Sequence, residues 1–315
     1  MSATRLGYHW RVTRAGARDL PDRRRIDAAL RALPVRRDKM ERILEDLKPS
    51  ARLLRRPERR HITGASRLGG IPDLSAGIAW PSYARQTERD GPPRISTTRV
   101  PLDFIAQVRL DDVPPEVLPQ ECPTTGLLSF FYDCDEAPWG FDPLDRGGGQ
   151  VLYQAPQVEL APTLQPPEVR ERTARAFTVE PGAEWTGPAS DGYLSDDEVI
   201  ACWDDLTRLI SRWPNEPEHR LLGHSQNIQN EMTLECQIVS SGLYFGDGPP
   251  DEHPEFEELA GGAKDWILLL QVDTDDGSDG PGWMWGDCGR IYFWIRRQDL
   301  AARRFERAWT VLQCT

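Results

Sequence analysis

Two glutamines, Gln107 and Gln271, are the first residues whose type and position could do chemistry. Each lies inside an apolar run, FIAQV at 104–108 and LLLQV at 268–272. A buried side-chain amide costs about 1–3 kcal/mol when its donors and acceptors are unpaired, so each amide must have partners. Either each glutamine ties a neighbouring loop to its strand, or the pair lines a shared cleft and binds a polar ligand.

The stretch WMWGDCGRIYFWI at 283–295 is a second candidate for ligand recognition. Side chains alternate between the two faces of a strand, so Arg290, Tyr292 and Trp294 share the face opposite the apolar core. Arginine pairs with carboxylates and stacks on aromatic rings, which suits recognition. The alternative is a second packed layer beneath a helix or the N-terminal arm. The predicted binding residues are Gln107, Gln271, Trp285, Asp287, Arg290, Tyr292 and Trp294.

Signals for metals and nucleophiles are weak. The sequence DTDDGSDG at 273–280 holds four carboxylates, but a glycine takes the third ligand place of a calcium loop and no glutamate follows at the twelfth. A solvated hairpin loop is therefore predicted. His219, His224 and Cys236 could form a zinc site. Cys288 could pair with His224 as a nucleophile, although nothing singles out either arrangement. We predict no metal and no cofactor, and assign no catalytic residue.

Composition indicates a globular protein that stays in the cytoplasm. The chain has 315 residues, of which 39% are hydrophobic, enough for a sizeable core. Its longest uninterrupted apolar run, at 266–270, is far too short to span a membrane. The N-terminus lacks the apolar stretch of a signal peptide. The six cysteines form no CxxC pair, which is typical of reduced thiols.

Charge is distributed unevenly along the chain. Residues 1–60 contain 18 basic and 8 acidic residues, whereas the remainder contains 20 basic and 42 acidic residues. The preferred interpretation is a basic arm that packs on its own acidic body. The alternative is an arm that meets nucleic acid or an acidic partner. Because an acidic body repels phosphate backbones, we do not expect a dedicated nucleic-acid binder.

Hydrophobic periodicity and turn residues place the elements. Helices are predicted at 22–33, 37–47, 195–213 and 227–241. Strands are predicted at 4–13, 104–110 and 306–314, and on the candidate recognition stretch. Loops are predicted at 83–100, 136–149 and 161–168. Several tryptophans, including Trp80, Trp139 and Trp283, lie beside glycine or proline in loops, where a role in an interface is plausible.

Three elements recur in the same order. SRLGGIP at 66–72 matches HRLLGHS at 219–225, each glutamine strand follows, and each copy ends in an apolar run opened by glycine. The repeat predicts that Gln107 and Gln271 are equivalent. It also predicts the following correspondence of positions: Leu127, Ser129 and Phe131 with Arg290, Tyr292 and Trp294.

These observations predict an α+β fold, mostly of antiparallel β-sheet, with an internal pseudo-duplication, a few packed helices and an N-terminal helical arm. The arm is predicted over residues 1–61, packing on the body. The domain is predicted over 62–315, with halves at about 62–190 and 191–315.

The chain resembles the YwqG-like family, bacterial proteins grouped as a domain of unknown function. The resemblance covers about residues 62–314, and Ser225 departs from a proline that is frequent in the family. It rests on SRLGGIPDLSAGIAWP, FIAQV, TGLLSFFYD, HRLLGHSQNIQ, WILLLQVDTDD, WGDCGRIYFWI and DLAARRFERAWTVLQC. It implies an α+β fold with an internal duplication and no catalytic residues that can be carried over. Some members lie in gene neighbourhoods with secreted toxins, which implies an interaction or immunity role.

We therefore expect a cytoplasmic, non-enzymatic protein that binds a protein or peptide partner. The alternative is an enzyme or small-ligand protein with a cleft between the two halves, lined by Gln107, Gln271, Asp287 and Arg290. A third possibility is a structural role in a larger assembly, with the basic arm as tether. Contact with a membrane is not expected.

Overall fold

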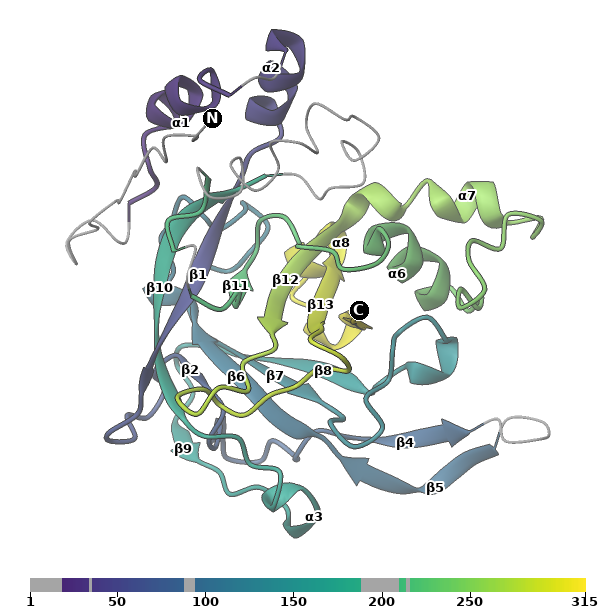
Figure 1. Ribbon diagram of the computed structural model, residues 1–315. Helices are drawn as coiled ribbons and strands as arrows, with labels where there is room; N and C mark the ends of the chain where they lie inside the picture. The colour runs from purple at the N-terminus through teal and green to yellow at the C-terminus, as the bar shows by residue number, and fades with distance from the viewer. Residues whose placement is uncertain (1–18, 34–35, 88–93, 188–209, 214–215) are drawn as a thin grey trace.

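The computed structural model describes residues 19–33, 36–87, 94–187, 210–213 and 216–315. The main regular elements of these residues are β-strands that run antiparallel to their neighbours, joined by loops and a few short helices (Figure 1). None of the helices within these ranges is long and apolar enough to cross a bilayer. The predicted antiparallel α+β character is thus confirmed.

One sheet dominates the molecule and contains ten strands. Their order across the sheet is β14 (Trp309–Gln313), β13 (Arg290–Arg296), β12 (Trp266–Asp273), β11 (Arg220–Leu221), β1 (Lys48–Pro57), β10 (Phe177–Thr186), β2 (Arg67–Leu68), β6 (Asp103–Arg109), β7 (Leu127–Tyr132) and β8 (Gly149–Gln154). Two small sheets pair β3 (Asp73–Ser75) with β9 (Leu160–Pro162), and β4 (Ser82–Thr87) with β5 (Arg94–Pro101).

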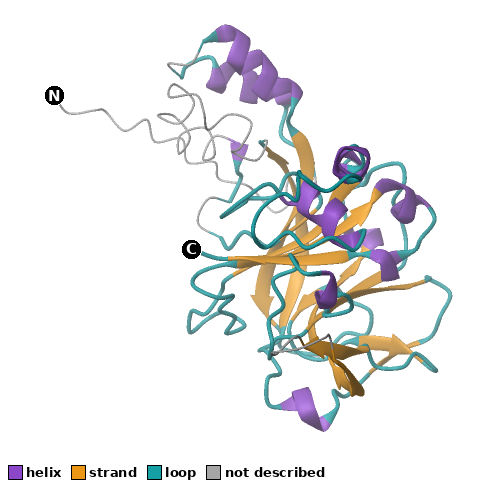
Figure 2. Ribbon diagram, turned by 90° about the vertical axis from the view of Figure 1, so that its right-hand side faces the viewer, coloured by secondary structure: helices purple, strands orange, loops and turns teal. Residues whose placement is uncertain are grey.

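Helices are short and lie mainly outside the strands (Figure 2). The α-helices are α1 (Arg23–Leu30), α2 (Arg37–Glu45), α3 (Pro167–Arg170), α6 (Met232–Ser240), α7 (Phe256–Ala260) and α8 (Arg297–Ala301). The 3₁₀ turns are η2 (Leu110–Asp112), η3 (Pro143–Asp145), η5 (Ala263–Asp265) and η6 (Phe305–Arg307).

The large sheet curls into a nearly closed barrel. Its two edge strands, β8 and β14, approach each other, and the backbone N–H of Leu312 donates to the carbonyl of Trp139 at 2.9 Å. A Cβ at Gly149 would overlap Thr310, so glycine permits this approach. Side chains from opposite strands of the barrel fill its interior. The rings of Phe130 on β7 and Phe293 on β13, for example, have centroids 5.2 Å apart.

The strands are arranged in the same order on both sides of the central pair β1 and β10. Outward from that pair comes a two-residue strand (β11 or β2), then a glutamine strand (β12 or β6), then β13 or β7, and then an edge strand. In both glutamine strands the pairing register shifts at the same place, before Leu270 and before Ala106. β1 precedes β2 in the chain yet pairs with β11, and β10 precedes β11 yet pairs with β2. The two series are therefore interlocked at the centre of the sheet.

Residues at the same register positions of the two series are called corresponding below. Gln271 pairs with Arg220 and Tyr292, and Gln107 pairs with Arg67 and Ser129. The predicted correspondence of Leu127, Ser129 and Phe131 with Arg290, Tyr292 and Trp294 agrees with this register.

In the structure, only part of the N-terminal region predicted as an arm is separate from the sheet. Strand β1 lies within residues 1–61, yet it is a central strand that pairs with β10 along its whole length. Only α1 and α2 stand apart at one end of the sheet, where Ile26, Met40 and Ile43 pack in a separate cluster that reaches Trp185. The predicted arm boundary at residue 61 therefore lies too far along the chain. The reason is that the three arginines of β1 are typical of an exposed basic segment.

The segment 83–100, predicted as a loop, forms most of the hairpin β4–β5, whose tip at 88–93 lies outside the described residues. Short elements also interrupt the other two predicted loops. Of the predicted helix 195–213, residues 195–209 lie outside the described residues, as does the predicted strand 4–13. The helix predicted at 227–241 begins only at Met232, because the N–H of Ile228 instead donates to the Gln313 side chain at 3.0 Å.

Candidate functional site

A row of polar side chains crosses the outer face of the sheet in the C-terminal series. Arg52 on β1 pairs in register with Arg220 on β11, which pairs with Gln271 on β12, which pairs with Tyr292 on β13. Their chain neighbours Ala51, Leu221 and Leu270 belong to the interior core, so alternation turns the polar row outward. Consecutive strands thereby place separate segments of the chain at one site.

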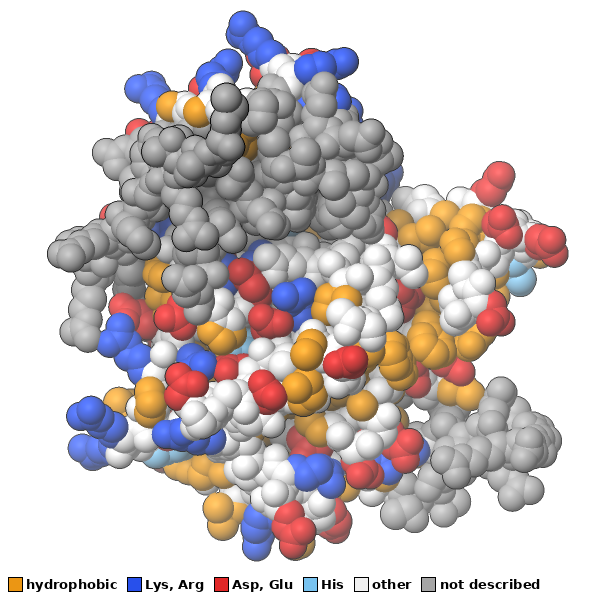
Figure 3. All heavy atoms as spheres, in the orientation of Figure 1, with side chains coloured by type: hydrophobic (Ala, Val, Ile, Leu, Met, Phe, Trp, Pro, Cys, Tyr) orange, Lys and Arg blue, Asp and Glu red, His pale blue; other side chains and the backbone are white. Residues whose placement is uncertain are grey.

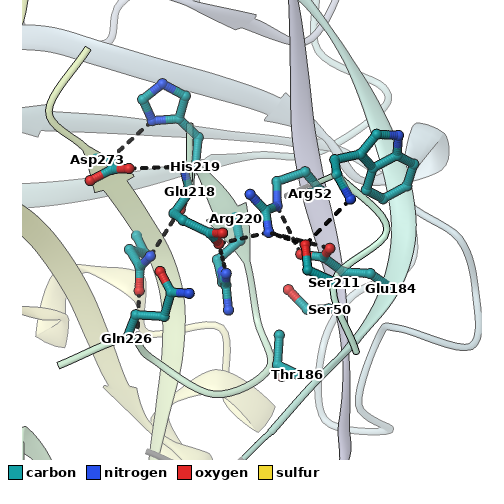
Figure 4. A network of polar contacts seen from close by, with 12 residues as sticks. Ser50, Arg52, Glu184, Thr186, Ser211, Glu218, His219, Arg220, Gln226 and Asp273 are labelled. Carbon is teal, nitrogen blue, oxygen red and sulfur yellow. Dashed lines mark hydrogen bonds and ion pairs between the residues drawn. The ribbon is translucent and has the colours of Figure 1, made fainter. Parts of the chain in front are cut away.

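Six charged residues of this region form what we name the Arg220 cluster: Arg52, Glu184, Glu218, Arg220, Asp273 and Arg290. Figure 4 shows the first five of them. Arg52 lies 2.8 Å from Glu184 through Nε and 2.6 Å from Glu218 through Nη2. Glu218 also pairs with Arg220. The formal charges of the cluster balance, which makes burial of so many ions tolerable.

The cluster is fully buried at one end and partly exposed at the other. The side chains of Arg52 and Glu184 are each 1% exposed. Asp273 and Arg290, whose carboxylate oxygen and Nε are 2.8 Å apart, are 16% and 21% exposed. A ligand group that approaches from solvent would therefore meet the Arg290 end first.

Four buried polar atoms at this site have no hydrogen-bond partner among the described residues: Glu218 Oε2, Arg290 Nε, Arg220 Nε and Gln226 Oε1. The first two have ion-pair partners, Arg52 and Asp273, whereas Arg220 Nε, a donor, and Gln226 Oε1, an acceptor, have none. Figure 4 draws the Arg220 and Gln226 side chains within one network of polar contacts. Burial and the nearby Arg52 guanidinium lower the pKa of Arg220 to about 9. Gln226 is held by its backbone: its carbonyl accepts a hydrogen bond from the Tyr292 hydroxyl at 2.6 Å. The amide is thus positioned but unused.

The N-terminal series has a closed version of this site. The Asp73 carboxylate is fully buried and accepts hydrogen bonds from the Gly64 N–H and the Gln107 side chain, both at 2.8 Å. His61 Nε2 lies 2.7 Å from this carboxylate and Arg67 Nη2 lies 3.3 Å from it. Every partner comes from the chain itself.

Hydrogen bonds show that Gln226 corresponds to Asp73. The N–H of Asp73 donates to Gln107 Oε1 at 2.8 Å, and the N–H of Gln226 donates to Gln271 Oε1 at 2.9 Å. The Gln271 amide also donates to the Glu218 carbonyl at 2.9 Å. Arg67 Nε lacks a partner just as Arg220 Nε does, so the difference between the two series is the free amide of Gln226.

The glutamines predicted as a pair do not meet. The Gln107 side chain bonds Ala65 and Asp73, whereas the Gln271 side chain bonds Glu218 and Gln226. Each ties a loop to its strand, which was the structural interpretation of these residues. Of the predicted binding residues, the structure brings together Gln271, Arg290 and Tyr292 around Gln226.

The other predicted residues lie elsewhere. Trp294 is buried and packs in a cluster with α6 residues, so the second packed layer is what the structure contains. Trp285 is also buried, and its indole donates to the Asp273 carbonyl at 3.1 Å. Asp287 is exposed in a turn, where its backbone carbonyl accepts from Thr315. Sequence reasoning missed Arg52 and Gln226; a lone arginine inside SARLL was the available signal.

The residues weighed as metal ligands have other partners. Asp275, in the acidic loop, lies 2.5 Å from Arg55 and 3.2 Å from the buried His219. His224 Nε2 contacts the Asp46 carbonyl, and Cys236 is buried in α6. No group of three or more His, Cys, Asp and Glu residues that could hold a metal occurs in the described ranges.

Glu235 is a second unusual buried group. It is 7% exposed on α6, and its carboxylate has no ion pair or hydrogen bond within the described part of the chain. Burial, and then the charge of Asp145, raise the pKa of Glu235 to about 7.

Replacing Glu235 with Gln will stabilise the protein at pH 8 but not at pH 5. Glu235 binds its proton more tightly in the folded state than in the unfolded state, where its pKa has the ordinary value of 4.5. The wild-type free energy of unfolding therefore falls as pH rises from 4.5 to about 7. Glutamine removes this dependence, and we expect a gain of about 1–3 kcal/mol at pH 8. Urea unfolding at both pH values measures it. Glu258→Gln, an exposed carboxylate on α7, is the control; an equal gain at both pH values would contradict the assignment.

Comparison with models of protein families gives a match. A family model described as a domain of unknown function, DUF1963, matches residues 66–314. The match includes both glutamine strands and the Arg220 cluster except for Arg52 on β1. No curated protein matches the chain.

Proposed function

Because the chain belongs to the DUF1963 family, whose function is unknown, we propose a function from its own residues. It is a binding protein that recognises a protein or peptide partner by an amide group at the Arg220 cluster. The observation that carries the proposal is that two buried atoms of this site, Arg220 Nε and Gln226 Oε1, have no hydrogen-bond partner in the described ranges. An amide group offers an acceptor for the first and a donor for the second.

Comparison of the two series supports this assignment. In the N-terminal series both carboxylate oxygens of the corresponding residue, Asp73, have internal partners, so this carboxylate needs no ligand. Gln226 has the same backbone tie but leaves its amide free. An unmet buried polar group costs about 1–3 kcal/mol, which a partner would recover on binding.

The position of the site favours a polypeptide partner. The cluster opens at its Arg290 end, which is partly exposed, so a side chain or backbone segment can enter from the surface. The alternative of a cleft shared by both halves has less support, since Gln107 and Gln271 have separate sets of partners. Arg290 adds a guanidinium at the entrance that can bond carbonyl groups of the same partner.

Gln226→Leu is expected to weaken partner binding by about tenfold or more without loss of stability, because its amide serves no internal contact and an unpaired buried group costs about 1–3 kcal/mol. A displayed library of twelve-residue peptides is selected on the wild-type chain, and the selected peptides are measured by calorimetry. Gln229→Leu, an exposed glutamine of the same loop, is the matched control and should bind like the wild type. Equal affinity for wild type and Gln226→Leu would refute the proposed site.

We propose further that the two strand series derive from a duplicated unit, which the equal strand order and equal register shifts support. The YwqG-like resemblance adds a role in the bacterial cytoplasm as an immunity-type partner. Co-purification with proteins encoded beside its gene tests that role; recovery of the chain alone would count against it.

A further inference from the structure

The lobe formed by α6, α7 and the segment between them is strongly acidic. From residue 221 to 263 the chain has eight Asp and Glu residues and no Lys or Arg. The exposed members on and before α7 are Asp247, Asp251, Glu252, Glu255, Glu257 and Glu258. Nothing basic within this segment balances them, so they produce a local negative field.

Aromatic rings border the same lobe. Phe141 lies between Trp139 and Tyr244, with ring centroids 6.2 Å and 5.8 Å away. Trp139 is 38% exposed and Tyr244 is 47% exposed. Figure 3 shows hydrophobic side chains gathered over the region of α6 and α7, with acidic side chains around them. We name the three rings and the six exposed carboxylates the acidic-aromatic surface.

A buried carboxylate lies on α6, which packs against α7. This residue, Glu235, has no cationic partner in the described ranges. A buried carboxylate is normally paired with a cation. Arg146 and Arg296 lie nearby, but they bond Ser240 and Gln237 of α6 rather than Glu235.

Arginine is the cation that this lobe already accommodates. The guanidinium of Arg146 lies 5.1 Å from the ring centre of Trp309, and that of Arg296 lies 5.0 Å from that of Trp266. Guanidinium groups stack on aromatic rings and bond carboxylates at the same time, whereas an ammonium group is a strongly hydrated point charge. A surface that combines exposed rings with carboxylates thus selects arginine over lysine.

We propose that the acidic-aromatic surface docks an arginine-rich segment of a partner protein. The argument rests on charge complementarity and on the exposed ring stack, and it does not depend on the Arg220 cluster. Arginines of the segment stack on Tyr244 and Trp139, and neighbouring arginines pair with carboxylates such as Asp251 and Glu252.

The test uses the full chain and fluorescein-labelled peptides of alternating Arg and Ser, or Lys and Ser. We expect the arginine peptide to bind more tightly than the lysine peptide by about threefold or more. Asp251→Lys/Glu252→Lys should weaken its binding by about tenfold, and Tyr244→Ser by about threefold. The matched control Glu168→Lys/Glu171→Lys, on α3 and directly after it, lies away from α6 and α7 and should change it by less than about twofold.

Three results would overturn the proposal. If the α3 control weakens binding as much as the lobe variant, only net charge attracts the peptide. If lysine and arginine peptides bind equally and Tyr244→Ser has no effect, the rings take no part. If sedimentation shows self-association of the wild type that Asp251→Lys/Glu252→Lys removes, a second copy of the chain is the occupant.

Discussion

Asp73→Asn will lower the free energy of unfolding by about 3–5 kcal/mol, the cost of leaving a buried charge without its partner. The variant keeps the size of the side chain, so no cavity contributes. It removes the negative charge that faces Arg67, whose side chain is 1% exposed. Glu58, 3.4 Å from Arg67, then remains as the nearest carboxylate. Urea unfolding measures the loss.

Asp276→Asn, an exposed position in the acidic loop, is the control and should change stability by no more than about 0.5 kcal/mol. A loss below about 1 kcal/mol for Asp73→Asn would mean that Glu58 suffices for Arg67. It would also weaken the comparison between Asp73 and Gln226 on which the binding site rests.

Local patterns in the sequence predict the sheet well where they are regular. The alternation of β13, the glycines that open β7 and β13, and the two glutamine strands all appear in the structure at the predicted places. These features depend on neighbours in the chain and on one core, so periodicity is sufficient to find them. In β6 a register shift before Ala106 interrupts the alternation, so Ile105 joins the interior core and Phe104 packs in a separate cluster.

Features that depend on distant segments could not be predicted. Arg52 looks like an arm residue until Glu184, 132 positions away, is placed beside it. The hairpin β4–β5 is polar, and it is held by contacts such as the Arg85 guanidinium with Asp133 at 2.8 Å. Likewise, nothing in RIYFWIR reveals that α6 covers Tyr292 and Trp294. In each case the deciding partner comes from a separate strand or helix.

Arg52→Met will also lower the free energy of unfolding by about 3–5 kcal/mol, because Glu184 loses its ion pair inside the sheet. Arg52 bonds Glu184 at 2.8 Å and the Pro217 carbonyl at 3.1 Å, and the carboxylate of Glu184 is 1% exposed. Removing both charges should restore much of the loss, since a well-packed apolar pair often replaces a buried ion pair without cost. The double variant Arg52→Met/Glu184→Leu completes the mutant cycle.

The interlocked strands determine how this loss is distributed. Arg52 lies on β1, which pairs with β10 and β11, so it connects both strand series. We therefore expect Arg52→Met to unfold in a single transition, with hydrogen exchange accelerated in β6 as much as in β12. If β12 exchanges faster while β6 keeps its protection, the two series are separate cooperative units. That result would also mean that Arg52 on β1 stabilises one series alone. β1 would then not couple the two series energetically.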